Sequence, residues 1–135
     1  MKNGKGFFSF VDGSTYTGEL KKDEIDGQGI YEWTDGKVYN GYWKSGKMQT
    51  EQGQVSTFTW PDKRKYVGEY NEDKKEGRGK FTFANGVEYD GEWFNGKQHG
   101  KGVLVSYEDP TANDNMKIEK KRMEGVWEDG KRQTN

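Results

Sequence analysis

Several residue types that usually stabilise or activate a protein are rare or missing in this sequence of 135 residues. There is no cysteine, which excludes disulfides, cysteine-based zinc sites and a cysteine nucleophile. The single histidine, His99, cannot supply a site with several histidine ligands, and the glycines do not form a Gly-Lys-Ser/Thr phosphate loop. We therefore expect no catalytic residues, no bound metal and no cofactor, and a protein that is not an enzyme.

Aliphatic residues are also scarce. Two leucines and three isoleucines are too few for a conventional aliphatic core, and so low a content favours disorder. Two features oppose disorder: the net charge is only −1, and aromatic residues make up 15 % of the chain, whereas disordered chains are poor in them. If the chain folds, aromatic rings and ordered glycines must stabilise it.

The sequence has neither an excess of one charge nor a long apolar run. Because 22 Lys and Arg residues balance 23 Asp and Glu residues, no overall field attracts nucleic acid. No stretch approaches the ~18 apolar residues of a membrane-spanning helix. Residues 1–6 lack the apolar segment of a secretory signal. These absences favour a cytoplasmic protein.

What the sequence does contain is an internal repeat with a spacing of 23 residues between its best copies. The tripeptide Tyr-x-Gly begins at Tyr16, Tyr39, Tyr66 and Tyr89, with a degenerate copy at Met123. A Gly-x-Gly element begins at Gly4, Gly27, Gly77 and Gly100. Turn dipeptides such as Asp12-Gly13, Asp35-Gly36 and Asn85-Gly86 lie between the two elements.

Alternating aromatic residues flank these turns, and Asp-Gly or Asn-Gly between alternating apolar positions is typical of a β-hairpin. A spacing of two, as in Tyr31/Trp33 and Tyr39/Gly41/Trp43, places all of these residues on one face of their strands. Because a lone hairpin is marginal in water, we expect the hairpins to pair with one another. The sequence therefore predicts an all-β fold, an elongated single-layer antiparallel sheet of about five stacked hairpins. In this sheet each Tyr-x-Gly glycine gives aromatic rings room to lie across the backbone.

The chain is predicted to be one repeat array over residues 1–135, and two of its units depart from the pattern. The units are approximately 4–26, 27–52, 53–76, 77–99 and 100–131, with an insertion at 106–122. In the third unit one extra residue precedes Trp60, which predicts a β-bulge there, and Lys63 replaces the turn glycine. In the fifth unit residues 108–115 have the composition of a loop.

The unit Tyr-x-Gly-x-Trp-x-x-Gly-x-x-x-Gly-x-Gly, best represented by residues 89–102, resembles the MORN repeat (membrane occupation and recognition nexus). The resemblance covers nearly all of residues 4–131. It implies a twisted single-layer sheet with an aromatic-lined groove, used as a scaffolding part of a larger assembly. Such arrays occur in radial-spoke heads of cilia, in junctional membrane complexes and in the cytoskeleton. The resemblance therefore implies a cytoskeleton- or cilium-associated setting.

The aromatic face is the candidate binding site, because a single-layer sheet has no second layer to cover its apolar side. We expect a segment of a partner protein to bind along it. The rings best placed for a partner-binding groove are Tyr31, Trp33, Tyr39, Trp43, Phe58, Trp60, Tyr66, Phe81 and Tyr89. The two open sheet edges are a second candidate, for strand pairing with another subunit.

Two other functions compete with that of a protein scaffold. Lys63, Arg64 and Lys65 form a small basic cluster, which suggests a peripheral binder of anionic phospholipids or phosphoinositides, although such sites usually gather four to eight basic residues. A cell-surface repeat that binds glycan or choline is the third interpretation. The missing signal peptide and the Gly-x-Gly element argue against it.

Overall fold

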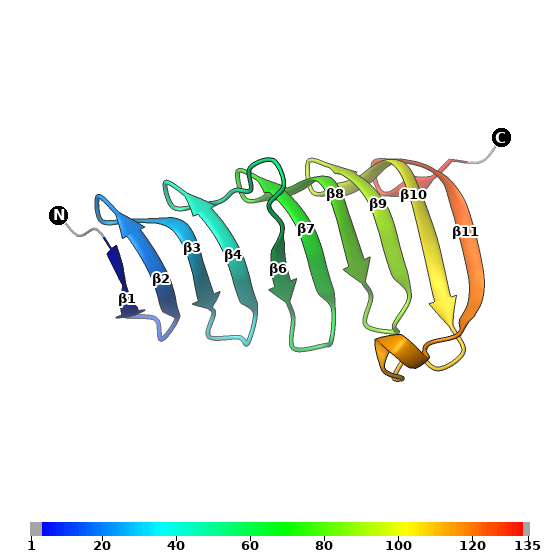
Figure 1. The fold of residues 1–135 in the computed structure, drawn as a ribbon, viewed down its shortest axis with the longest axis horizontal. Helices are drawn as coiled ribbons and strands as arrows, with labels where there is room; N and C mark the ends of the chain where they lie inside the picture. The colour runs from blue at the N-terminus through cyan, green and yellow to red at the C-terminus, as the bar shows by residue number, and fades with distance from the viewer. Residues whose placement is uncertain (1–3, 134–135) are drawn as a thin grey trace.

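The computed structural model describes residues 4–133, which form one open antiparallel sheet. Figure 1 shows the strands side by side along an elongated molecule. The strands are β1 (Gly4–Ser9), β2 (Thr15–Lys21), β3 (Glu24–Glu32), β4 (Val38–Lys44), β5 (Lys47–Met48), β6 (Ser56–Thr59), β7 (Lys65–Asn71), β8 (Lys74–Thr82), β9 (Glu88–Phe94), β10 (Lys97–Tyr107), β11 (Glu119–Glu128) and β12 (Lys131–Arg132). The predicted all-β, single-layer antiparallel sheet is confirmed.

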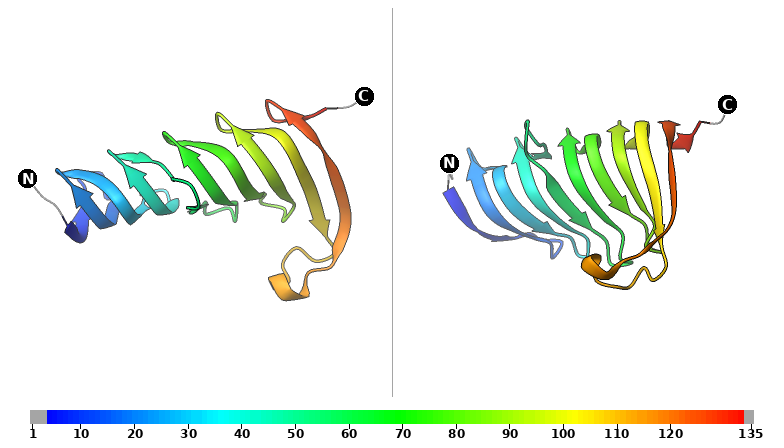
Figure 2. Two further views of the ribbon diagram at one scale, coloured as in Figure 1. Left: turned by 45° about the horizontal axis from the view of Figure 1, so that its top comes forward. Right: turned by 45° about the vertical axis from the view of Figure 1, so that its right-hand side comes forward.

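The strand order follows the chain order from β1 to β12, except that the short β5 pairs only with β4 and lies beside the main path. The sheet twists along its length, and within residues 4–133 no second layer packs on either face (Figure 2). Each hairpin therefore contacts only its neighbours, as in other repeat proteins.

Turns at both ends of the strands need left-handed backbone, which explains many of the glycines. At one edge Gly13, Gly36 and Gly86 have φ of 94°, 97° and 88°, and Lys63 takes this position in the third unit with φ of 77°. At the other edge some turns have no glycine: Lys22 and Asp23 have φ of 52° and 66°. Positive φ at both central residues is the pattern of a type I′ hairpin turn.

Acidic side chains on the polar face stabilise a repeated β-bulge. The register shifts between Gly18 and Leu20 and again at the matching positions of β7 and β9. The Glu19 carboxylate accepts a hydrogen bond of 2.7 Å from the backbone N–H of Gln28 on the next strand. Glu69 and Glu92 accept from Arg78 and Lys101 in the same way. These glutamates therefore satisfy backbone groups that the bulge leaves unpaired.

The bulge predicted before Trp60 is wrong, because β6 pairs with β4 and with β7 without a register shift. The extra residues are instead accommodated outside the strand, in a turn closed by a hydrogen bond of 2.9 Å from the Gln54 N–H to the Glu51 carbonyl. Thr50 completes the linker: its N–H donates to the Tyr70 carbonyl at 3.0 Å, and its hydroxyl accepts from the Tyr70 N–H at 2.9 Å. A side chain thus replaces part of a strand.

The insertion in the fifth unit forms a loop with a short 3₁₀-helix, η1 (Asp114–Met116), before β11 begins at Glu119. Glu88, which is only 6 % exposed, holds the loop against the sheet. Its carboxylate accepts a hydrogen bond of 2.6 Å from the Tyr107 hydroxyl and lies 3.7 Å from the Lys117 Nζ. Figure 1 shows η1 at the turn edge below β9 and β10, away from the middle of the sheet.

Candidate functional site

Aromatic side chains from alternate strand positions form two rows on one face of the sheet. The first, called the buried row here, zigzags between strands through edge-on contacts with ring centroids between 4.8 and 6.1 Å apart. Its members are Tyr16, Trp43, Tyr39, Tyr70, Tyr66, Trp93, Tyr89 and Trp127, and none is more than 7 % exposed. Edge-to-face pairs of this kind are favourable beyond their buried area.

Hydrogen bonds fix the polar ends of the buried row. The Tyr16 hydroxyl donates to the Glu19 carbonyl at 2.8 Å, and Tyr66 and Tyr89 donate to the equivalent carbonyls at 2.9 Å. The Trp93 Nε1–H donates to the Gly79 carbonyl at 3.0 Å. Burial raises the pKa of the Tyr16 hydroxyl to about 12. These rings have the satisfied polar groups of a protein core.

Glycines give the tyrosines of the buried row their room. A Cβ on Gly29 would lie 2.1 Å from the Tyr16 hydroxyl, and one on Gly79 would lie 2.2 Å from the Tyr66 hydroxyl. In the irregular third unit Ser56 takes the equivalent position, and its Oγ accepts from the Tyr42 N–H at 3.0 Å. The prediction concerns the Tyr-x-Gly glycines, and it holds for them, since a Cβ on Gly68 would lie 2.5 Å from the Tyr66 hydroxyl. The Gly-x-Gly glycines Gly29 and Gly79 have the same role, which was not predicted.

The second row, called the outer row here, runs beside the buried row toward the turn edge. Its rings follow one another with centroids 4.3 to 5.7 Å apart, in the order Phe10, Tyr31, Trp33, Phe58, Trp60, Phe81 and Phe83. Phe10 is 41 % exposed, and Tyr31, Trp33, Trp60 and Phe83 are half-buried. The outer row therefore presents apolar surface to solvent at five of its seven rings, while Phe58 and Phe81, each 8 % exposed, are buried between them.

Two hollows lie on the aromatic face. The larger, of about 490 Å³, is at the β1–β3 end and is lined by Phe8, Phe10, Tyr16, Leu20, Ile25 and neighbouring residues. Leu20 stands there at the position that Trp43, Tyr70 and Trp93 hold in other units. The smaller hollow, of about 280 Å³, lies between Lys75, Phe81, Phe83 and Trp93. Each hollow is large enough to receive a side chain of another molecule.

The structure divides the nine residues predicted for the groove. Tyr39, Tyr66 and Tyr89 have no exposed surface, and Trp43, Phe58 and Phe81 are at most 8 % exposed. These six rings belong to the core of the free chain. Of the predicted set, Tyr31, Trp33 and Trp60 keep accessible surface.

Three accessible residues were missed: Phe10, Phe83 and Lys75. A signal was present for the two phenylalanines, since they precede their turns as Trp33 and Trp60 do. Nothing in the sequence placed Lys75 among the rings.

The predicted basic cluster does not share one surface. Lys63 lies in a turn and Lys65 begins β7 on the polar face. Arg64 binds the Asp62 carboxylate, Nε to Oδ2, at 2.8 Å and lies over the Trp60 ring. The three cations therefore point to different environments and do not form a concentrated anion site.

The described residues also carry no feature of a metal site or of an unsatisfied buried polar group. Within residues 4–133, no group of three or more histidine, aspartate and glutamate side chains is placed to hold a metal ion. In the same part of the chain every buried side-chain nitrogen or oxygen has a hydrogen-bond partner. No helix formed by these described residues has the length and apolar character needed to cross a membrane.

Comparison with known protein families finds one family that matches this chain. The family model described as MORN repeat matches residues 1–15, 16–38, 66–88 and 89–107. The unmatched stretch between the second and third matches contains the irregular linker 49–55 and its Ser56. A search of curated proteins gives no significant match.

Proposed function

Because the chain belongs to the MORN-repeat family, whose members are typically non-enzymatic scaffolds that mediate protein–protein or membrane-lipid interactions, we propose that it is a non-enzymatic interaction module for a partner protein. A segment of the partner binds along the outer row. The observation that carries the proposal is the line of contacting rings from Phe10 to Phe83, five of which keep accessible surface. Large apolar patches on a soluble surface usually mark an interaction site.

The buried row explains why the outer row is available. The fold is held by rings whose hydroxyl and indole groups are already satisfied within the sheet. The outer row loses unfavourable contact with water when it is covered. An extended strand or an amphipathic helix laid along such a face follows known modes of peptide recognition.

We propose the edges of the sheet as a second contact to another subunit. Within residues 4–133, β1 pairs on one side only, and β12 covers only Trp127 and Glu128 of β11. Lys120, Lys121 and Arg122 lie on β11, and charged residues discourage strand pairing at an edge. The edge at β1, with the sequence Gly-Lys-Gly-Phe-Phe-Ser, is the better candidate for end-to-end pairing.

The setting that we propose is a cytoplasmic multi-subunit assembly associated with the cytoskeleton or a cilium. Its support is the family resemblance alone, since radial-spoke heads and cytoskeletal complexes contain such arrays. A fluorescent fusion that concentrates at cilia, basal bodies or the cell cortex agrees with this setting. A fusion spread evenly through the cytosol contradicts it, and enrichment on membranes favours the phospholipid alternative.

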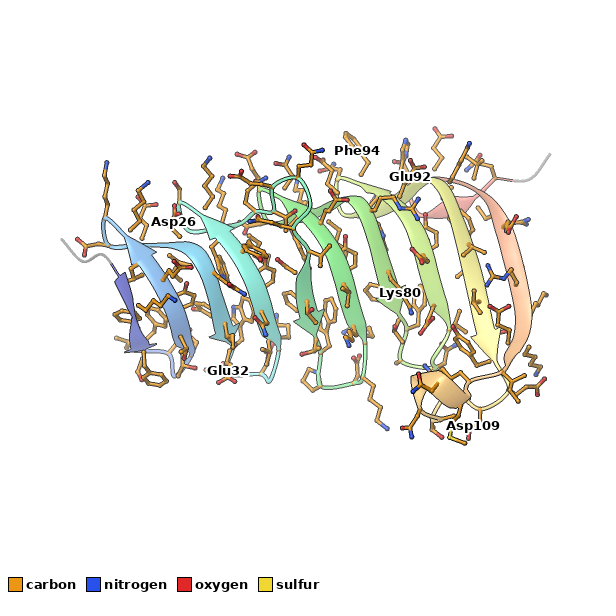
Figure 3. The ribbon with its side chains drawn as sticks, in the orientation of Figure 1. Asp26, Glu32, Lys80, Glu92, Phe94 and Asp109 are labelled. Carbon is orange, nitrogen blue, oxygen red and sulfur yellow. The ribbon has the colours of Figure 1, made fainter. Side chains whose placement is uncertain are left out.

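Affinity purification with mass spectrometry tests the binding function. The unchanged chain is compared with Trp33→Ala and with the control Phe94→Ala, which removes a ring that is 58 % exposed outside the outer row. Figure 3 shows Phe94 at the edge opposite the Glu32 end of the strands. We expect Trp33→Ala to lose partners that Phe94→Ala retains. Equal recovery with both folded variants contradicts the proposal.

The phospholipid alternative needs its own assay. Vesicle flotation with and without phosphoinositides measures it directly. Flotation that is lost at high salt and on neutralising Lys63, Arg64 and Lys65 favours a membrane role over the proposed one.

A further inference from the structure

One lysine lies among the rings of the aromatic face. Lys75 is on β8, and its Nζ is 5.6 Å from the ring centroids of Trp60, Tyr66, Phe81 and Trp93. It is partly buried and lines the smaller hollow of about 280 Å³. An ammonium over aromatic faces is attracted by the ring quadrupole. The four rings therefore hold this charge in a fixed place on the surface that we assign to the partner.

The residue at the position of Lys75 differs from unit to unit. The cross-strand positions of three other units carry Ile25 opposite Leu20, Met48 opposite Trp43 and Gln98 opposite Trp93, and the fifth unit carries Arg132 opposite Trp127. Lys75 is opposite Tyr70 in the same place. Apolar or neutral residues therefore satisfy the packing at this position in three of the five units, so the fold of a unit does not require a charge there.

The charge of Lys75 has no acidic counterpart in the described chain. Within residues 4–133 no carboxylate oxygen lies within ion-pair distance of its Nζ. Burial lowers the pKa of Lys75, and the positive charge of Arg64 acts in the same direction. The Arg64 guanidinium itself is bound to the Asp62 carboxylate. Lys75 is thus a partly desolvated cation that is stabilised by ring faces alone. A bound anion beside its Nζ would stabilise the charge further.

We propose that the segment bound on the outer row carries an aspartate or glutamate whose carboxylate pairs with Lys75, next to an apolar side chain that fills the hollow between Phe81, Phe83 and Trp93. This inference rests on the proposed function and adds the chemistry of the partner. A single carboxylate matches a single cation, whereas phosphoinositide headgroups call for clusters of basic residues. The surrounding rings select an apolar neighbour for that acid.

The test uses a library of random peptides displayed on phage and selected against the whole chain. We expect the selected peptides to contain Asp or Glu beside an aromatic or aliphatic residue. The affinity of a selected synthetic peptide is then measured for the unchanged chain, for Lys75→Met and for the control Lys44→Met, whose lysine is exposed on the polar face. Methionine is suited to the position because Met48 occupies its equivalent in the second unit. Circular dichroism confirms that each variant keeps its β-sheet.

Lys75→Met is expected to weaken binding of the acidic peptide about tenfold or more, as loss of a partly buried charge pair does. Lys44→Met leaves the affinity unchanged. Selection against Lys75→Glu yields peptides with Lys or Arg in place of the acid. Unchanged affinity with Lys75→Met, or selected peptides without acids, overturns the inference.

The variant Trp33→Ala separates this inference from the proposed function. If it weakens peptide binding while Lys75→Met does not, the outer row binds a partner without using Lys75. If neither substitution affects binding, the outer row is not the site and the proposed function fails as well.

Discussion

The two rows of rings share one face of one sheet, yet they differ in what surrounds them and in composition, since the buried row consists of Tyr and Trp and the outer row is mostly Phe and Trp. In the buried row, Tyr66 has no exposed surface, its hydroxyl is hydrogen-bonded, and Gly79 lies directly beneath it. In the outer row, Trp33 and Trp60 touch rings on both sides but remain half-buried. The presence of an aromatic ring therefore does not by itself separate the core from the accessible surface; the neighbours that enclose each ring do.

The difference teaches how a single-layer fold can be stable and still present an apolar surface. The buried row is covered by rings from its own neighbours, so each tyrosine is enclosed without a second layer. The outer row lies closer to the turn edge, where short turns cannot cover it. If the proposed function is right, stability and binding belong to parallel lines of residues, and substitutions in each line should have different consequences.

The largest expected effect is at the centre of the buried row. Tyr66→Ala removes a fully buried ring and should lower the free energy of unfolding by about 3–5 kcal/mol, as other aromatic truncations in cores do. Tyr66→Phe keeps the ring but leaves the Glu69 carbonyl without its donor, and should cost about 1 kcal/mol. Urea denaturation measures both. A loss under about 1 kcal/mol for Tyr66→Ala would show that the buried row is not the core.

A pair of glycine substitutions sharpens the comparison. Gly79→Ala should destabilise the sheet by about 1–3 kcal/mol, because its Cβ would lie 2.2 Å from the Tyr66 hydroxyl. Gly6→Ala is the matched control, since the nearest atom to its Cβ is Phe8 Cζ at 3.1 Å, on a side chain that can move. Thermal unfolding of both variants should give a clearly lower midpoint only for Gly79→Ala. Equal midpoints would contradict the close packing of ring on glycine.

A smaller effect is expected from pH. Burial raises the pKa of Tyr16 from 10.0 to about 12, so its contribution to stability is complete below about pH 10 and is lost as the pH rises toward 12. Between about pH 9 and pH 11 the free energy of unfolding of the unchanged chain should fall as this hydroxyl ionises. Tyr16→Phe lacks the hydroxyl, so its free energy of unfolding should fall by on the order of 1 kcal/mol less over the same range. Urea denaturation at the two pH values provides the measurement. Parallel losses in the two proteins would mean that the Tyr16 hydroxyl is not buried.

The smallest effect on stability is expected at the exposed end of the outer row. Phe10 is 41 % exposed and contacts Tyr31, so Phe10→Ala should change the free energy of unfolding by less than about 1 kcal/mol. The same substitution should weaken a partner that reaches the hollow at Leu20. A loss of stability as large as that of Tyr66→Ala would place the outer row in the core.

The fold could be predicted because its signals are local. Asp-Gly and Asn-Gly dipeptides mark turns, and aromatic residues two apart mark one face of a strand. The turns at Lys22-Asp23 and Glu72-Asp73 could not be predicted, because they adopt positive φ without glycine. The third unit was misjudged because Thr50 supplies a hydroxyl where a strand supplies backbone, and no repeat pattern encodes such a replacement.

The site could be predicted only in outline. The sequence identifies which rings share a face, but their exposure depends on which neighbour lies over them. Tyr31 and Tyr39 are cross-strand partners, yet Tyr31 remains accessible while Tyr39 is enclosed by Trp43, Phe58 and Tyr70. The environment of Lys75 depends on Trp60, Tyr66 and Trp93, which follow β6 or lie on β7 and β9, and on Phe81 of its own strand β8. These rings become neighbours of Lys75 only in the folded sheet.

The central claim is that the outer row binds a partner while the buried row holds the fold. It is tested most directly by isothermal titration of the purified partner into the unchanged chain and into the Trp33→Ala/Trp60→Ala double variant, with urea denaturation of both proteins. The account predicts that the double variant stays folded and binds at least about tenfold more weakly, as loss of central aromatic contacts does. A folded double variant with unchanged affinity would contradict it.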